Sequence, residues 1–363
     1  MRLQLRRADR IAVLIALGAL LIGASVRAEP EGDRATVVAR TSIYLDDDDT
    51  AISTSIVSVR ARPFGNVSVG MRYVADAVSS ASVDVVTAAT GRWTELRSEV
   101  LAGVGYADGT TTLSADYVFS HENDWDSHTV SAGGSRDLFQ HNLTLGAGAS
   151  IVDNHVGRAE DESFGERMRV LGGSLRAVWV AGKLDIFQSS YELSRASGYQ
   201  SSPYRYAFVD DPSGVPIAFA EVSPELRLRQ ALTLRWNHHL LRDAALRSHV
   251  RSYADDWGVR SLTAGTELVV GVGPYELAAN VRLYAQRHAE FYQDVYDRPR
   301  RYMTADRELS TFQDAFLGVR GRWIGESFAL DAALTGFVFR FPEFSRLPMR
   351  RGFTAALGLV WAI

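Results

Sequence analysis

The chain has no cysteine, so disulfide bridges and thiolate metal sites are excluded. After the first 28 residues no apolar run is long enough for a membrane helix, and no segment shows the helical period. There is also no excess of positive charge. Without those 28 residues the chain has 34 basic and 42 acidic residues, which argues against a nucleic-acid partner. The main signal in this sequence must therefore be of another kind.

The N-terminal residues have the three-part layout of a secretory signal peptide. Four arginines lie within residues 1–10, an apolar run of 14 residues follows from Ile11 to Ala24, and Val26-Arg27-Ala28 completes the pattern. We expect cleavage after Ala28, so that residues 1–28 are removed and residues 29–363 form a single domain. A retained anchor is the less favoured alternative, because the run is short for crossing a bilayer.

Nearly everything after residue 35 alternates apolar and polar residues with a period of two, which is the period of a β-strand. The clearest case is "LRLRQALTLRWN" (226–237), where leucines alternate with arginines. The alternation predicts about sixteen strands, within a range of about 14 to 18. Their expected bounds are 36–45, 51–62, 67–77, 93–107, 110–121, 127–138, 142–154, 168–180, 183–196, 224–239, 244–256, 259–272, 275–289, 312–324, 327–341 and 352–363.

One predicted strand, 183–196, breaks the alternation. Leu184 and Ile186 are out of phase with the apolar residues that follow, so we expect a β-bulge there.

The connections between these strands alternate in length. Tight joins such as "FQHN" (139–142) and "GPY" (273–275) are followed by longer ones. The longer connections are 78–92, 155–167, 197–223, 290–311 and 342–351. Short periplasmic turns and long extracellular loops are typical of an outer-membrane barrel, so the predicted fold is all-β, a transmembrane antiparallel up-and-down barrel.

Two features favour this barrel over a soluble β-sandwich. Many of the strands run to a dozen residues or more, whereas strands of globular proteins average about five or six. Aromatic residues also share the predicted lipid-facing phase near one end of their strands, as in the girdle at a membrane interface. The girdle residues are Tyr106, Trp179, Trp236, Tyr275, Trp323, Phe328 and Trp361.

The opposite phase carries charged residues, which predicts a polar lumen. A water-filled channel and a lumen cross-linked by arginine–carboxylate pairs are equally consistent with this pattern. The candidate lumen residues are Arg72, Arg97, Arg227, Arg229, Arg235, Arg247 and Arg251. The last five fall on two neighbouring predicted strands and form a weak patch that favours anionic solutes.

The connection "DAVSSASVDVVTAATGRW" (76–93) is unlike an ordinary surface loop, because it has no proline and little charge. We predict that it folds over or into the barrel mouth and that Asp84 meets Arg72 or Arg97 there. The alternative is a plain hairpin that extends the flanking strands.

Two further features are candidates for function, one for a cation site and one for catalysis. The acidic turn Asp46, Asp47, Asp48 and Asp49 is a weak candidate for a cation site, since hard cations prefer clustered carboxylates. Of the eight histidines, His288 has Glu290 nearby but no evident nucleophile. We therefore expect no catalytic site, no resident metal and no cofactor.

Four stretches resemble signature segments of a bacterial family known as domain of unknown function 3570. They are "DAVSSASVDVVTAATGRWTELRSE", "SRASGYQSSPYRYAFV" (194–209), "RSYADDWGVRSLTAGTEL" (251–268) and "VRLYAQRHAEFY" (281–292). The resemblance implies an outer-membrane β-barrel without an established substrate. It also implies that the gene lies near genes for thioredoxin-like proteins, a lipoprotein and a flavin transferase. This neighbourhood would suit a periplasmic redox or lipoprotein partner.

The leading hypothesis is a porin-like outer-membrane barrel of a Gram-negative envelope, either a passive channel or an accessory of an envelope redox system. The alternatives are a closed barrel that scaffolds a periplasmic or surface partner and, less favoured, an outer-membrane hydrolase. The expected partners are outer-membrane lipid, lipopolysaccharide and the barrel assembly machinery.

Overall fold

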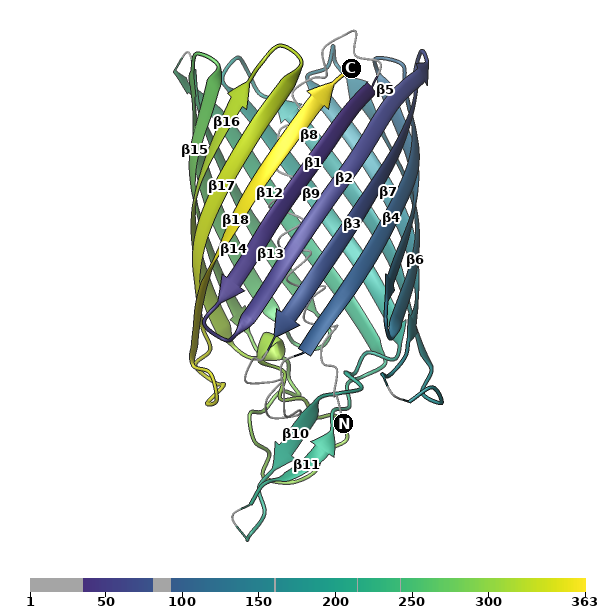
Figure 1. Cartoon of the computed structure of the whole chain (residues 1–363), viewed down its shortest axis with the longest axis vertical. Helices are drawn as coiled ribbons and strands as arrows, with labels where there is room; N and C mark the ends of the chain where they lie inside the picture. Colours follow the sequence, from purple (N-terminus) through teal and green to yellow (C-terminus); the bar gives the residue numbers. More distant parts are fainter. Residues whose placement is uncertain (1–34, 81–92, 160, 214, 242) are drawn as a thin grey trace.

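The described part of the chain folds mainly into one closed antiparallel β-barrel in the computed structural model (Figure 1). The structure describes residues 35–80, 93–159, 161–213, 215–241 and 243–363. Within them lie β1 (Ala35–Asp46), β2 (Thr50–Phe64), β3 (Val67–Ser80), β4 (Trp93–Ala107), β5 (Thr111–Glu122), β6 (Trp125–Leu138), β7 (Leu143–Val156), β8 (Glu166–Val180), β9 (Asp185–Gly198), β10 (Tyr206–Val209), β11 (Ile217–Ala220), β12 (Leu226–Leu241), β13 (Ala244–Asp255), β14 (Arg260–Val272), β15 (Tyr275–Arg287), the 3-10 helix η1 (Arg307–Leu309), β16 (Phe312–Ile324), β17 (Phe328–Arg340) and β18 (Met349–Ala362).

The barrel closes between its first and last strands. Tyr44 of β1 lies opposite Ile52 of β2 on one side and opposite Thr354 of β18 on the other. All other neighbours follow chain order except β9 and β12, which pair directly because β10 and β11 form a separate two-stranded sheet. Closure removes exposed strand edges, whose backbone N–H and C=O groups would find no hydrogen-bond partner in lipid.

The predicted fold class and the count of sixteen barrel strands are confirmed within the described residues. The bulge expected in 183–196 is wrong. β9 keeps one continuous register with both β8 and β12. The strand begins at Asp185, so Leu184 lies in the preceding turn, and Ile186 takes the inward phase opposite Val180.

Large apolar side chains cover the outer surface of the barrel instead of its interior. Leu175, Leu317 and Leu357 are 62%, 68% and 68% exposed, and leucines and valines in the same phase continue around the wall. A soluble monomer rarely exposes a contiguous apolar patch larger than a few hundred Å². This surface suits the hydrocarbon of a bilayer. No helix in the described part of the chain is long and apolar enough to span a membrane.

The two ends of the barrel differ in the length of their connections (Figure 1). The end at the top of the figure, here called the inner end, carries the short turns, and there Ala35 and Ile363 pair through backbone hydrogen bonds of 3.1 and 2.8 Å. The opposite, outer end carries the long connections, including the β10–β11 sheet. Within the described residues the long connections thus lie at one mouth, as the alternation in loop length predicted.

Candidate functional site

The lumen wall between β2 and β4 is a ladder of paired charges. Arg72 of β3 reaches Glu99 of β4 at 3.1 Å. Arg97 bonds to the same Glu99 and lies 3.5 Å from Asp76. Thr54 donates a further hydrogen bond of 2.6 Å to Asp76. Arg72 and Arg97, both expected in the lumen, therefore have carboxylate partners on the wall itself. Asp84, their expected partner, lies outside the described residues.

A glycine makes room for one of these cross-strand pairs. Arg40 of β1 and Asp331 of β17 lie on either side of β18, opposite Gly358, and their side chains meet at 3.0 Å. A Cβ atom on Gly358 would stand 2.6 Å from the Asp331 carboxylate, so a larger residue would push the pair apart. The small residue lets an ion pair lie across an intervening strand.

The arginine patch predicted on two neighbouring strands lies on β12 and β13, and its members differ in their partners. Three of them have acidic partners. Arg227 contacts Asp255 at 2.6 Å, Arg247 contacts Glu267 at 3.2 Å, and Arg251 lies 3.8 Å from Glu192.

The other two, Arg229 and Arg235, form no hydrogen bond or ion pair within the described part of the chain. Arg235 lies opposite His249, whose ring covers Gly265 of β14. Arg229 lies opposite Asp255 and close enough to Asp255 and Asp256 to interact with both carboxylates. Of these five arginines, Arg235 alone therefore has no acidic partner within the described residues.

The acidic turn between β1 and β2 is held by arginines and by its own backbone. Asp48 forms a 2.6 Å ion pair with Arg307, and both side chains are almost fully buried. Asp46 accepts hydrogen bonds from the amides of Asp48 and Thr50, at 3.1 and 2.9 Å, which closes the turn. Asp47 accepts from the Arg351 amide at 2.7 Å. Among the described residues no group of three acidic or histidine side chains is placed to hold a metal ion.

The long loops of the outer end pack into a structure of their own, here called the cap, made of 199–213, 215–225, 256–259, 288–311 and 341–348. Its first core joins the β10–β11 sheet to the β15–β16 loop, where Tyr296 is fully buried and Val209 and Val222 form bridges with Tyr296 and Met303. The Tyr296 hydroxyl donates to the carbonyl oxygen of Phe291, and burial raises the pKa of this phenol. The raised pKa keeps the donor protonated.

A second core fixes the cap to the rim of the barrel. Trp257 and Val259 of the β13–β14 turn pack against Ala289 and Tyr292. The Trp257 indole donates to the carbonyl oxygen of Leu226 at 2.8 Å. Burial raises the pKa of Tyr292, whose hydroxyl donates to the Glu343 carbonyl at 3.1 Å. Loops that are far apart in the sequence thus hold one another in place.

The cap also covers aromatic residues that face into the barrel. Phe337 and Phe339 of β17 lie in the inward phase and are buried with Phe312, Phe341 and Phe344. These phenyl rings are shielded from water although the neighbouring lumen wall is charged. The β17–β18 loop contributes two of the rings in the cluster, Phe341 and Phe344, and so helps to bury the others. The guanidinium of Arg350 lies 4.4 Å from the centre of the Phe339 ring, a cation–π contact. Arg350 thereby joins the aromatic cluster to the polar network of the cap.

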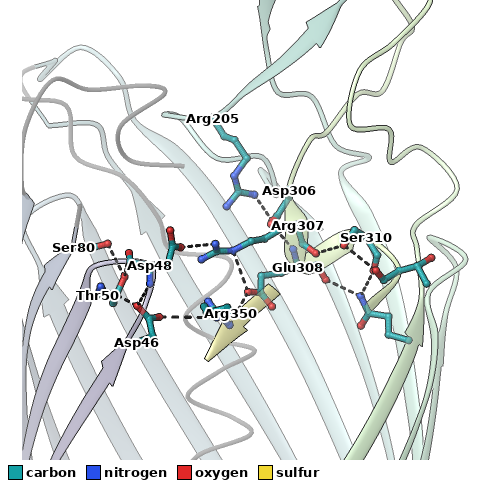
Figure 2. A network of polar contacts seen from close by, with 12 residues as sticks. Asp46, Asp48, Thr50, Ser80, Arg205, Asp306, Arg307, Glu308, Ser310 and Arg350 are labelled. Atoms are coloured by element: carbon teal, nitrogen blue, oxygen red, sulfur yellow. Dashed lines mark hydrogen bonds and ion pairs between the residues drawn. The ribbon is translucent and has the colours of Figure 1, made fainter. Parts of the chain in front are cut away.

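Figure 2 shows the polar network that ties the cap to the barrel. Besides Asp48, Arg307 of η1 lies 3.8 Å from Glu308. Arg350 of β18 approaches Glu308 at 3.7 Å and Asp46 at 4.0 Å.

On the cap side, Arg205 contacts Asp306 and lies 3.5 Å from Glu221, which accepts a 2.9 Å hydrogen bond from Thr304. Buried charges of this kind are tolerated only when they are paired, so the network fixes how the loops sit on the rim.

His288, the histidine considered for catalysis, has a partner in the cap. Its Nδ1 atom lies 2.8 Å from Glu343 and 3.2 Å from the Thr311 hydroxyl. Burial raises the pKa of Glu343, but the hydrogen bonds from His288 and Thr311 outweigh it and lower that pKa overall. A nucleophile–histidine–acid relay needs its nucleophile on the other ring nitrogen, and both contacts here share Nδ1.

The seven aromatic residues predicted to form a girdle lie near the inner end of the barrel. Phe328 lies opposite Trp361, and Tyr275 lies opposite Trp323. Six of the seven side chains are substantially exposed on the outer surface, and Trp323 packs edge-on against Phe328 at 5.0 Å. Phe187 joins this aromatic group, since its ring stacks between those of Trp179 and Trp236. The irregular alternation of its strand hides this residue in the sequence.

Sequence reasoning missed the residues of the cap network: Arg205, Glu221, Thr304, Asp306, Arg307, Glu308 and Arg350. A usable signal was present in part. Three of the four motif stretches quoted above contain cap residues, namely Arg205 in 194–209, Trp257 in 251–268 and Tyr292 in 281–292.

The comparisons with known proteins agree with this architecture. The model of the family described as "Protein of unknown function (DUF3570)" matches residues 180–324, which confirms the resemblance seen in the motifs. None of the curated proteins compared with the chain matches it. Among solved structures, a "Bacterial polysaccharide outer membrane secretin" is 10% identical with a TM-score of 0.56, and the match covers 91% of this chain and 99% of that one.

A second solved structure, "CdiB from Acinetobacter baumannii", is 11% identical with a TM-score of 0.53. The match covers 90% of this chain and 60% of that chain. At such identities the likeness concerns the fold, which is that of an outer-membrane β-barrel.

Proposed function

We propose that the protein lies in the outer membrane of a Gram-negative envelope as a porin-like barrel through which small polar solutes pass, with the cap screening the outer mouth. One observation carries the proposal: Arg235 faces the lumen, exposed and without a carboxylate partner within the described part of the chain. A charge without a partner is costly in a dry interior and cheap in water, so it supports a hydrated lumen. It also favours anionic solutes.

Recordings of the purified protein in planar bilayers test this proposal. A channel gives steady unitary currents that are somewhat anion-selective. The same recording with chloride replaced by a large organic anion should show a smaller current, because the cap narrows access. A membrane that stays electrically silent after verified insertion would reject the channel.

The second candidate is a closed barrel that scaffolds a partner, and the cap itself favours it. Its cores bury Tyr296, Phe341 and Phe344 completely, as a folded docking surface would. A silent bilayer together with binding of a surface protein to the cap of the full-length barrel would support this role. A hydrolase finds less support, because the contacts of His288 do not form a nucleophilic relay.

A further inference from the structure

Exposed arginines gather on the lipid-facing surface at the outer ends of the strands. One group lies on β8 and β9 and the other on β14, β15 and β17. The arginines of these groups are Arg167, Arg169, Arg195, Arg260, Arg287 and Arg340. All six are exposed.

The register shows that these side chains belong to the outward phase. Arg195 lies opposite Leu171 of β8 and Leu228 of β12, both exposed on the outer surface. Arg260 lies opposite Arg287, two residues from the outward-facing Leu262. The guanidinium groups therefore stand at the edge of the apolar belt, on the side of the cap.

The second group lacks neutralising carboxylates. Arg260 and Arg287 are directly opposite each other, and neither forms an ion pair within the residues that the structure describes. Like charges in facing positions of two strands destabilise the pair unless an anion lies between them. In the first group Arg169 pairs with Asp153 at 2.7 Å, and Arg167 and Arg195 have no ion pair in the described ranges.

The inner end shows the opposite character. Its lipid-facing rim is aromatic, and the outward-facing Arg136 there lies close enough to the Asp108 carboxylate of the neighbouring turn to interact with it. The chain as a whole carries a net charge of −4, so a cationic outer rim is not a consequence of composition. Two different rims suit a membrane whose two leaflets carry different headgroups.

We infer that the outer-rim arginines bind the phosphate groups of lipopolysaccharide in the outer leaflet. Guanidinium groups bind phosphate oxygens in a bidentate manner and hold their charge at any physiological pH. The facing pair Arg260 and Arg287 offers two such forks at the level where a lipid A phosphate would lie above the acyl chains. The inference rests on the proposed location in the outer membrane.

The test uses full-length protein in detergent and three probes: bisphosphorylated lipid A, lipid A without its phosphates, and inorganic phosphate. Native mass spectrometry counts the bound lipid. The variant R260Q/R287Q should bind bisphosphorylated lipid A roughly tenfold or more weakly, since each charge-assisted contact contributes more than a factor of ten. R136Q is the matched control at the inner rim and should bind like the unmodified protein.

Unmodified protein should prefer the bisphosphorylated lipid over the dephosphorylated one, and millimolar phosphate should not displace it. Equal retention of both lipids, or equal binding by R260Q/R287Q, would overturn the inference. Displacement by inorganic phosphate would also overturn it, because the site would then be a free-anion site. Conductance recorded from the same variants keeps this outcome separate from the channel proposal, since neither arginine faces the lumen.

Discussion

Removing the guanidinium of Arg307 should open the cap without unfolding the barrel. The substitution Arg307→Leu removes the 2.6 Å ion pair between Arg307 and Asp48, whose side chain is only 1% exposed. Breaking a buried pair by removing one member costs about 3–5 kcal/mol. If that cost falls on the opening of the cap, the opening equilibrium rises by roughly two to three and a half orders of magnitude.

Amide hydrogen exchange measures this opening directly. The amides of Tyr296 and Met303 donate to the carbonyl oxygens of Phe208 and Val222 at 2.7 and 2.9 Å, so they exchange only when the cap opens. Both should exchange faster in Arg307→Leu by that factor, while barrel amides such as that of Val281 keep their rates. The double variant Asp48→Leu/Arg307→Leu should recover much of the protection, because both members of the buried pair are then replaced by apolar side chains.

The matched control is Asp297→Asn, which removes an exposed ion pair with Arg300 in the same loop. Such pairs contribute little, so exchange at Tyr296 should not change. Unchanged exchange in Arg307→Leu, or a similar acceleration in the control, would show that the network does not hold the cap.

Three further outcomes follow from the same structure. Replacing Arg235 with glutamate should move the reversal potential of the channel toward cation selectivity, whereas Arg136→Glu on the outer surface should leave it unchanged; no shift would mean that Arg235 does not face the conducting path. Because the hydrogen bonds from His288 and Thr311 lower the pKa of Glu343 below the ordinary 4.5, the contact with His288 should be fully present above that value. As the pH falls through the lowered pKa, the contact should be lost and exchange in 341–348 should accelerate, and Glu343→Gln should abolish that pH dependence. In single-tryptophan variants, bromine-labelled lipids should quench Trp179, which is 54% exposed at the inner rim, and spare Trp257, which is 5% exposed; equal quenching would argue against the girdle.

The barrel could be predicted from the sequence because its determinants are local. Each lipid-facing residue is two positions from the next, so the alternation around Leu232 and Leu234 is visible without knowledge of any partner strand. The girdle was visible for the same reason. The error at β9 arose where a turn residue, Leu184, was counted as part of the strand.

The cap could not be predicted because its contacts are not periodic. Arg307 and Asp48 are 259 positions apart, and nothing in either neighbourhood indicates the other. For His288 the sequence pointed to the adjacent Glu290, whereas the loops bring Glu343 to it from 55 positions away. Strands as short as β10 and β11, with four residues each, show too few alternations to be recognised.

Single-cysteine labelling in intact cells tests the central claim, a lipid-covered barrel around a watery lumen, most directly. The chain has no cysteine, so a single substitution at each of residues 232–235 in β12 gives an unambiguous signal. A small water-soluble maleimide should label Arg235→Cys, where the inward side chain is exposed, and spare Leu232→Cys and Leu234→Cys. Thr233 also faces inward but is only 7% exposed, so Thr233→Cys should label more slowly than Arg235→Cys. Labelling without a period of two, or none at the inward positions, would contradict the account.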